Sequence, residues 1–170
     1  MFFSIKSVGD ESLEKLKSKD WNGLAEMKLV ERSSVGRITT LCMRMLNKEG
    51  YREFSKTAAM FDIVRILENI GDEYTLLNDY LTVAATKPSE DTLEMYKKVN
   101  DLIDDVYLVL YRFDRARLSA AYQKIKRIRR AEMDCIISKK SKEEAIVLHR
   151  LRKVSELMGS ILEEMMVVSL

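Results

Sequence analysis

Apolar side chains recur at spacings of three and four residues through almost the whole of this chain. One such series is Ile63, Ile66, Leu67, Ile70, Tyr74, Leu77 and Leu81. This repeat is typical of an amphipathic α-helix with one buried face, and no segment shows the alternation of a β-strand. One proline and six glycines in 170 residues also leave few positions for turns. The sequence therefore predicts an all-α fold.

Turn and capping residues divide the chain into six predicted helices. Asp20 and Ser89 stand where N-caps are expected, Asp114 marks a turn, and Ser141 begins a capping box. The expected helices cover residues 12–19, 21–46, 51–86, 90–113 and 115–138, and a last one follows Ser141 and includes Val168. In the second helix we expect a buried stripe of Leu24, Met27, Val30, Ile38, Leu41 and Met45.

The two halves of the chain resemble each other, which indicates an internal duplication. The matches are residues 20–25 with 114–119, Glu68 with Glu156, and Gly71 with Gly159. We therefore expect two tandem three-helix bundles, residues 1–87 and 88–170, related by internal pseudo-symmetry and packed as one compact domain. The first helix is shorter than its repeat partner. Because glycine has no Cβ, Gly71 and Gly159 are predicted to mark close packing where the two third helices meet.

The segment Leu67-Glu68-Asn69-Ile70-Gly71-Asp72 resembles the signature Leu-Glu-Arg-Ile-Gly-Asp of the PhoU family, the cytoplasmic regulators of phosphate uptake. Residues 29–35, with Leu29-Val30-Glu31-Arg32 and Val35, also resemble the second helix of archaeal and bacterial members. The resemblance implies a PhoU-like fold of two tandem three-helix units. It also implies a non-enzymatic role in phosphate homeostasis, as an adaptor on the ATPase of a phosphate ABC transporter and, in bacteria, on a phosphate-sensing kinase.

Glu68 and Asp72 lie one helical turn apart, so their carboxylates point the same way. They could supply part of the ligand set of a Mg²⁺, Mn²⁺, Fe or Zn ion, with waters or another helix completing it. The resemblance adds that some family members hold metal clusters on motifs of the form acid-x-x-x-Asp. This chain departs from those motifs at Gly36 and Ser160, and Glu156 remains as a degenerate second-repeat equivalent. The alternative is a solvated or arginine-paired acidic face.

The densest group of positive charges is Lys124, Lys126, Arg127, Arg129 and Arg130. It can be a solvated helix face, a docking patch for a protein, or a contact to nucleic-acid phosphates. No DNA-reading motif accompanies it, so nucleic acid is the least favoured of these. Residues 62–105 are mainly acidic and residues 115–153 mainly basic, and side-by-side packing of the two regions would neutralise both.

Other classes of protein lack support in the sequence. There is no glycine-rich phosphate loop, no G-x-S-x-G motif and no cysteine with a plausible histidine partner, so we expect no enzyme. His149 alone cannot supply the two Glu-x-x-His motifs of a ferritin-like di-metal site. No apolar run approaches the roughly 18 residues of a membrane span. We expect a cytoplasmic protein with reduced Cys42 and Cys135 that does not insert into membranes. The oligomeric state stays open, a homodimer included.

Overall fold

The structure is a computed structural model that describes residues 1–129, 138 and 141–169, apart from the side chains of Lys28, Arg32 and Ser33. Its elements are α1 Phe2–Ser18, α2 Trp21–Glu31, the π-helical turn η1 Arg32–Gly36, α3 Arg37–Glu49, the 3₁₀ turn η2 Phe54–Lys56, α4 Thr57–Ala84, α5 Glu90–Tyr111, α6 Arg115–Arg127 and α8 Lys142–Ser169. Because α2, η1 and α3 follow without a break, they form one long helix. The described residues thus contain six long helices and no strand, and the all-α prediction is confirmed.

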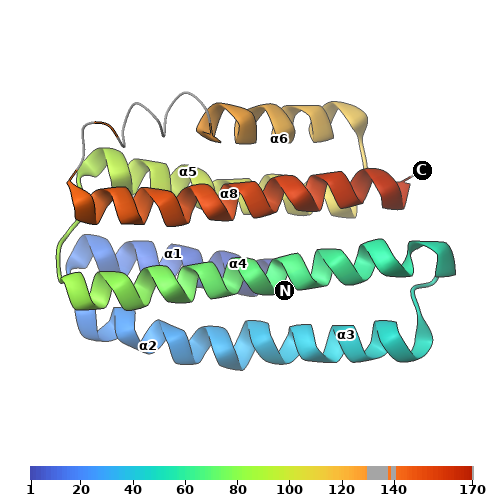
Figure 1. Cartoon of the computed structure of the whole chain (residues 1–170), viewed down its shortest axis with the longest axis horizontal. Coiled ribbons are helices and arrows are strands. Elements are labelled where there is room, and N and C mark those ends of the chain that lie inside the picture. The colour runs from blue at the N-terminus through green and yellow to red at the C-terminus, as the bar shows by residue number, and fades with distance from the viewer. Residues whose placement is uncertain (130–137, 139–140, 170) are drawn as a thin grey trace.

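The helices lie side by side with nearly parallel axes (Figure 1). α4 and α8 form the most extensive contact between two described helices and occupy the middle of the view. Behind them α1 packs against α5, while the α2–α3 helix covers α4 below and α6 covers α5 and α8 above. Buried apolar residues from all of these helices except α3 form one core. Within the described residues, no helix is both long and apolar enough to cross a membrane.

Two predicted helix starts are wrong. α1 begins at Phe2 instead of residue 12, because Phe2, Ile5 and Val8 are buried at helical spacing and extend its apolar face. α4 begins at Thr57 instead of residue 51, since Gly50, with a φ of 72°, ends α3 and the chain turns before η2. The fifth predicted helix is described only as far as Arg129, so its expected end at residue 138 lies beyond the described part of that helix.

The predicted N-caps at Asp20 and Ser141 are confirmed, and Asp114, at a predicted turn, also caps its helix. The backbone N–H of Gly23 donates to Asp20 Oδ1 (2.9 Å), and that of Arg117 donates to Asp114 Oδ1 (2.8 Å). The N–H of Glu144 donates to Ser141 Oγ at 3.3 Å. At Ser89 the chain is extended before α5, but the side chain makes no capping bond, and the Ser89 N–H donates to the Glu144 carboxylate instead.

The predicted buried stripe of the second helix is correct only in its first part. Leu24 and Met27 are buried. The four exposed members are Val30, Ile38, Leu41 and Met45. For Ile38, Leu41 and Met45, which follow η1, the cause is this turn, since a π-helical turn contains more residues than an α-helical turn and delays every later position. The buried face of α3 therefore falls on Thr39, not Ile38, and Thr39 is the one fully buried residue of α3.

Hydrogen-bonded polar groups join α1, α4 and α5 inside the core. The Tyr74 hydroxyl donates to Asn100 Oδ1 (2.6 Å), and Asn100 Nδ2 donates to Asp10 Oδ1 (3.0 Å). Asn78 Nδ2 also donates to Ser12 Oγ, at 2.8 Å. Burial raises the pKa of Tyr74 well above its usual range, so its hydroxyl keeps its proton and remains a donor. These bonds fix the register of the three helices, because a shift would leave buried polar atoms unpaired.

Candidate functional site

The predicted carboxylate pair lies on α4, with Glu68 half-buried and Asp72 exposed. Neither side chain forms a hydrogen bond or ion pair with another described residue. The described part of the chain also contains no group of three or more His, Cys, Asp or Glu side chains that could share a metal ion. The pair therefore offers two carboxylates, and a metal ion bound there would need its other ligands from water or a partner.

A third carboxylate, Glu31, lies between the second helix and α4. It is 4% exposed, and its Oε2 accepts a hydrogen bond from Thr75 Oγ1 of α4 at 3.4 Å. Gly71 makes the space for it, since a Cβ at that position would meet Glu31 Oε1 at 2.7 Å and Val35 Cγ1 at 3.2 Å. The sequence drew attention to Glu31 only through the family resemblance. A signal that could have located it is Gly71, a glycine inside a helix.

The prediction that Gly71 and Gly159 mark the contact of the two third helices is wrong. The nearest neighbours of a Cβ at Gly71 belong to α2 and η1. At Gly159, the nearest described atom is Ile125 Cγ2 of α6, at 3.7 Å from such a Cβ. Both glycines thus face the second helix of their own half of the chain.

In the second half of the chain, Glu156 is paired with arginine. Its Oε1 lies 3.3 Å from Arg152 Nε and 3.6 Å from Arg129 Nε. Ser160, where the acid-x-x-x-Asp motif would have its aspartate, donates to the backbone carbonyl of Glu156 at 3.4 Å. Two guanidinium groups therefore stand beside the carboxylate of the degenerate motif, where a cation would otherwise balance its charge.

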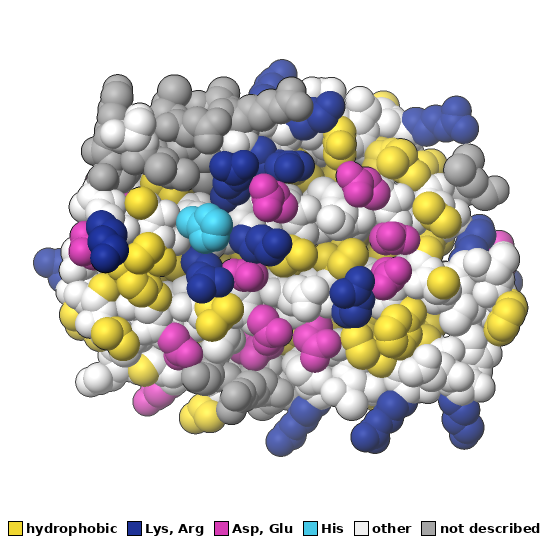
Figure 2. All heavy atoms as spheres, in the orientation of Figure 1, with side chains coloured by type: hydrophobic (Ala, Val, Ile, Leu, Met, Phe, Trp, Pro, Cys, Tyr) yellow, Lys and Arg dark blue, Asp and Glu magenta, His cyan; other side chains and the backbone are white. Residues whose placement is uncertain are grey.

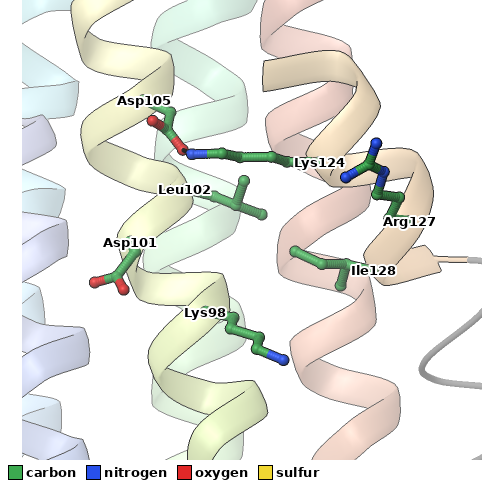
Figure 3. Close-up of a pocket in the computed structure, with 7 residues that line it drawn as sticks. All are labelled: Lys98, Asp101, Leu102, Asp105, Lys124, Arg127 and Ile128. Carbon is green, nitrogen blue, oxygen red and sulfur yellow. Dashed lines mark hydrogen bonds and ion pairs between the residues drawn. The ribbon is translucent and has the colours of Figure 1, made fainter. Parts of the chain in front are cut away.

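The basic residues of α6 border a groove between α5 and α6 (Figure 3). Its volume is about 240 Å³, and it is lined by Lys98, Asp101, Leu102, Asp105, Lys124, Arg127 and Ile128. Lys124 extends across the groove to Asp105, with Nζ 2.8 Å from Oδ2. Arg127 is exposed and has no ion-pair partner among the described residues. Leu102 and Ile128 are buried and form the apolar part of the lining.

The rest of the basic cluster is partly engaged within the molecule. Lys126 Nζ lies 4.9 Å from the centre of the Tyr122 ring, and Arg129 is paired with Glu156. Arg130 lies outside the described residues. Another pair, Arg150 Nη1 with Glu73 Oε2 at 2.9 Å, joins α8 to α4. Positive and negative side chains intermingle on the face shown in Figure 2. The pairs Lys124–Asp105 and Arg150–Glu73 join the basic region of the sequence to the acidic one.

The described residues define an all-helical protein with ion pairs between its helices and a groove between α5 and α6. Comparisons of the chain with protein-family models, curated proteins and solved structures find no match. Any assignment of function must therefore rest on the chain's own residues.

Proposed function

We propose that this protein is a non-enzymatic, cytoplasmic regulator of phosphate transport, an adaptor that binds the ATPase of a phosphate ABC transporter. The observation that carries the proposal is the packing of the two halves: α1 contacts α5, α4 contacts α8, and α2 and α6 each cover the third helix of their own half. Two copies of a three-helix unit facing each other would pack in this way. This pattern supports the PhoU-like fold implied by the resemblance of residues 67–72.

The groove between α5 and α6 suits docking of a protein partner better than binding of nucleic acid. Leu102 and Ile128 offer an apolar lining, and Arg127 at its edge is available to a partner's carboxylate. Interfaces commonly combine a small apolar centre with such an arginine. Lys124 and Arg129, in contrast, already pair with Asp105 and Glu156, so fewer positive charges are available to a phosphate backbone.

Affinity purification from phosphate-replete cells tests this function. The tagged protein should recover the transporter ATPase. Arg127→Glu should reduce the recovered amount at least about fivefold, because the new glutamate would repel the partner's carboxylate at the edge of the groove. Arg117→Glu is the matched control, since Arg117 is exposed on the same helix and does not line the groove. If the tagged protein recovers other partners but not the transporter ATPase, the proposal is refuted. Equal recovery with Arg127→Glu would show that docking occurs on another surface.

We also propose that Glu68 and Asp72 supply two ligands of a Mg²⁺, Mn²⁺, Fe or Zn ion. Elemental analysis of protein purified without chelators should find bound metal. The Glu68→Ala/Asp72→Ala variant should lose this metal, since both carboxylates would coordinate the same ion. A Glu163→Ala/Glu164→Ala variant removes two acids from α8 and should retain the metal. Equal metal content in all three proteins would mean that the carboxylate pair binds none.

A further inference from the structure

α3 presents a row of apolar side chains to solvent. Ile38, Leu41 and Met45 follow each other at helical spacing and are 37%, 58% and 51% exposed. A row at this spacing normally indicates a buried helix face, and the sequence alone predicts that this one is buried. Single exposed apolar residues are common on protein surfaces, but a contiguous row on one helix indicates an interaction surface.

The row is exposed because α3 packs on one side only. Its contacts with described helices are with α4 and η1, whereas α2 in the same long helix packs against both α1 and α4. Thr39, not a large apolar residue, is the fully buried side chain of α3. The π-helical turn η1 sets this orientation, and such turns occur frequently at functional sites.

The charge beside the row is positive. Arg37, Arg44 and Lys48 share one stripe of α3 with Leu41, since the four positions follow at steps of four, three and four residues. None of the three cations forms an ion pair or hydrogen bond with any described residue. The one acidic residue of α3 is Glu49, at its last position. The surface therefore combines an apolar row with a line of uncompensated positive charge.

We propose that this surface, which we call the α3 face (Arg37, Ile38, Leu41, Arg44, Met45 and Lys48), binds an acidic amphipathic helix of a partner protein. Apolar residues of that helix pack on Ile38, Leu41 and Met45, and its carboxylates pair with the three cations. A second copy of this chain is a poorer occupant, because a two-fold contact through the α3 face brings the same cations together. The inference rests on the adaptor role proposed above, but not on the groove between α5 and α6 or on phosphate.

The probe is a synthetic amphipathic helix of about 18 residues, long enough to hold helical structure, with leucines along one face and glutamates beside them. A copy with lysine in place of every glutamate is the matched control. Fluorescence anisotropy with the full chain should show that the glutamate peptide binds at least about tenfold more tightly, with an affinity that falls as salt rises. Leu41→Glu and Arg44→Glu should each lower its affinity about tenfold or more.

Val83→Glu is the matched substitution elsewhere, since Val83 is 86% exposed on α4 and its replacement should leave binding unchanged. Far-ultraviolet circular dichroism and thermal unfolding show whether each variant keeps its fold. Equal binding of the two peptides, or an affinity that Leu41→Glu does not alter, overturns the inference. Dimerisation that Leu41→Glu abolishes would assign the α3 face to a second copy of the chain. Competition by anionic lipid vesicles would assign the face to a membrane. Either result also overturns the inference. Arg127→Glu should not change the affinity for the glutamate peptide, so this inference and the proposed phosphate function can fail separately.

Discussion

Replacing Asn100 by alanine is expected to destabilise the protein by about 2 to 4 kcal/mol. Asn100 is 0% exposed and joins two other helices, accepting from the Tyr74 hydroxyl and donating to Asp10. Alanine leaves both partners without their bond and creates a cavity, so desolvation and packing losses add. Urea unfolding followed by circular dichroism measures the change in the free energy of unfolding.

Tyr74→Phe is the matched variant, since it removes the hydroxyl and keeps the ring. It should cost about 1 kcal/mol, because Asn100 keeps its bond to Asp10. The double variant should lose less free energy of unfolding than the two single variants lose together. The difference, which is the coupling free energy, should be about 0.5 kcal/mol or more. Strict additivity would argue that the bond between the Tyr74 hydroxyl and Asn100 does not stabilise the fold.

Gly71→Ala should destabilise the protein by about 1 to 3 kcal/mol, although alanine is the better helix former. The new methyl group would lie 2.7 Å from Glu31 Oε1 and 3.2 Å from Val35 Cγ1. Glu31 is buried and bonded to Thr75, so it cannot move aside without losing that contact. The same urea unfolding experiment measures this loss.

Gly159→Ala provides the control for Gly71→Ala. At that position the nearest described atom would be 3.7 Å from the new Cβ, an ordinary van der Waals distance. We expect this variant to be stabilised by up to about 1 kcal/mol through its gain in helix propensity. Equal stability of the two variants would show that Gly71 does not serve to accommodate Glu31.

Most of the helical framework could be predicted from the sequence, because the signals that specify it are local. Caps such as Asp20 and Asp114 act within a single turn, and apolar spacing marks each helix. The orientation of α3 could not be predicted in this way. The spacing of the apolar residues from Leu24 to Met45 fits an unbroken α-helix, and no sequence motif indicates the π-helical turn between them.

The candidate sites show the same division between local and distant signals. Glu68 and Asp72 could be found because both belong to one turn of one helix. The buried position of Glu31 depends on how α2 meets α4, and the pairing of Glu156 with Arg129 depends on how the residues just after α6 meet α8. Contacts of this kind arise from packing between distant segments, which residue spacing in one helix does not specify.

The π-helical turn η1 also affects which changes of sequence length this protein tolerates. The long helix contains one residue more than an α-helical path between α2 and α3 would need. Deletion of one residue between Arg32 and Gly36 would restore ordinary winding and leave the sides of α2 and α3 where they are. The same deletion within α3 would rotate the residues beyond it by about 100° relative to those before it. η1 is therefore the segment of this long helix in which one residue can be deleted without exchanging the buried and exposed sides of the helix.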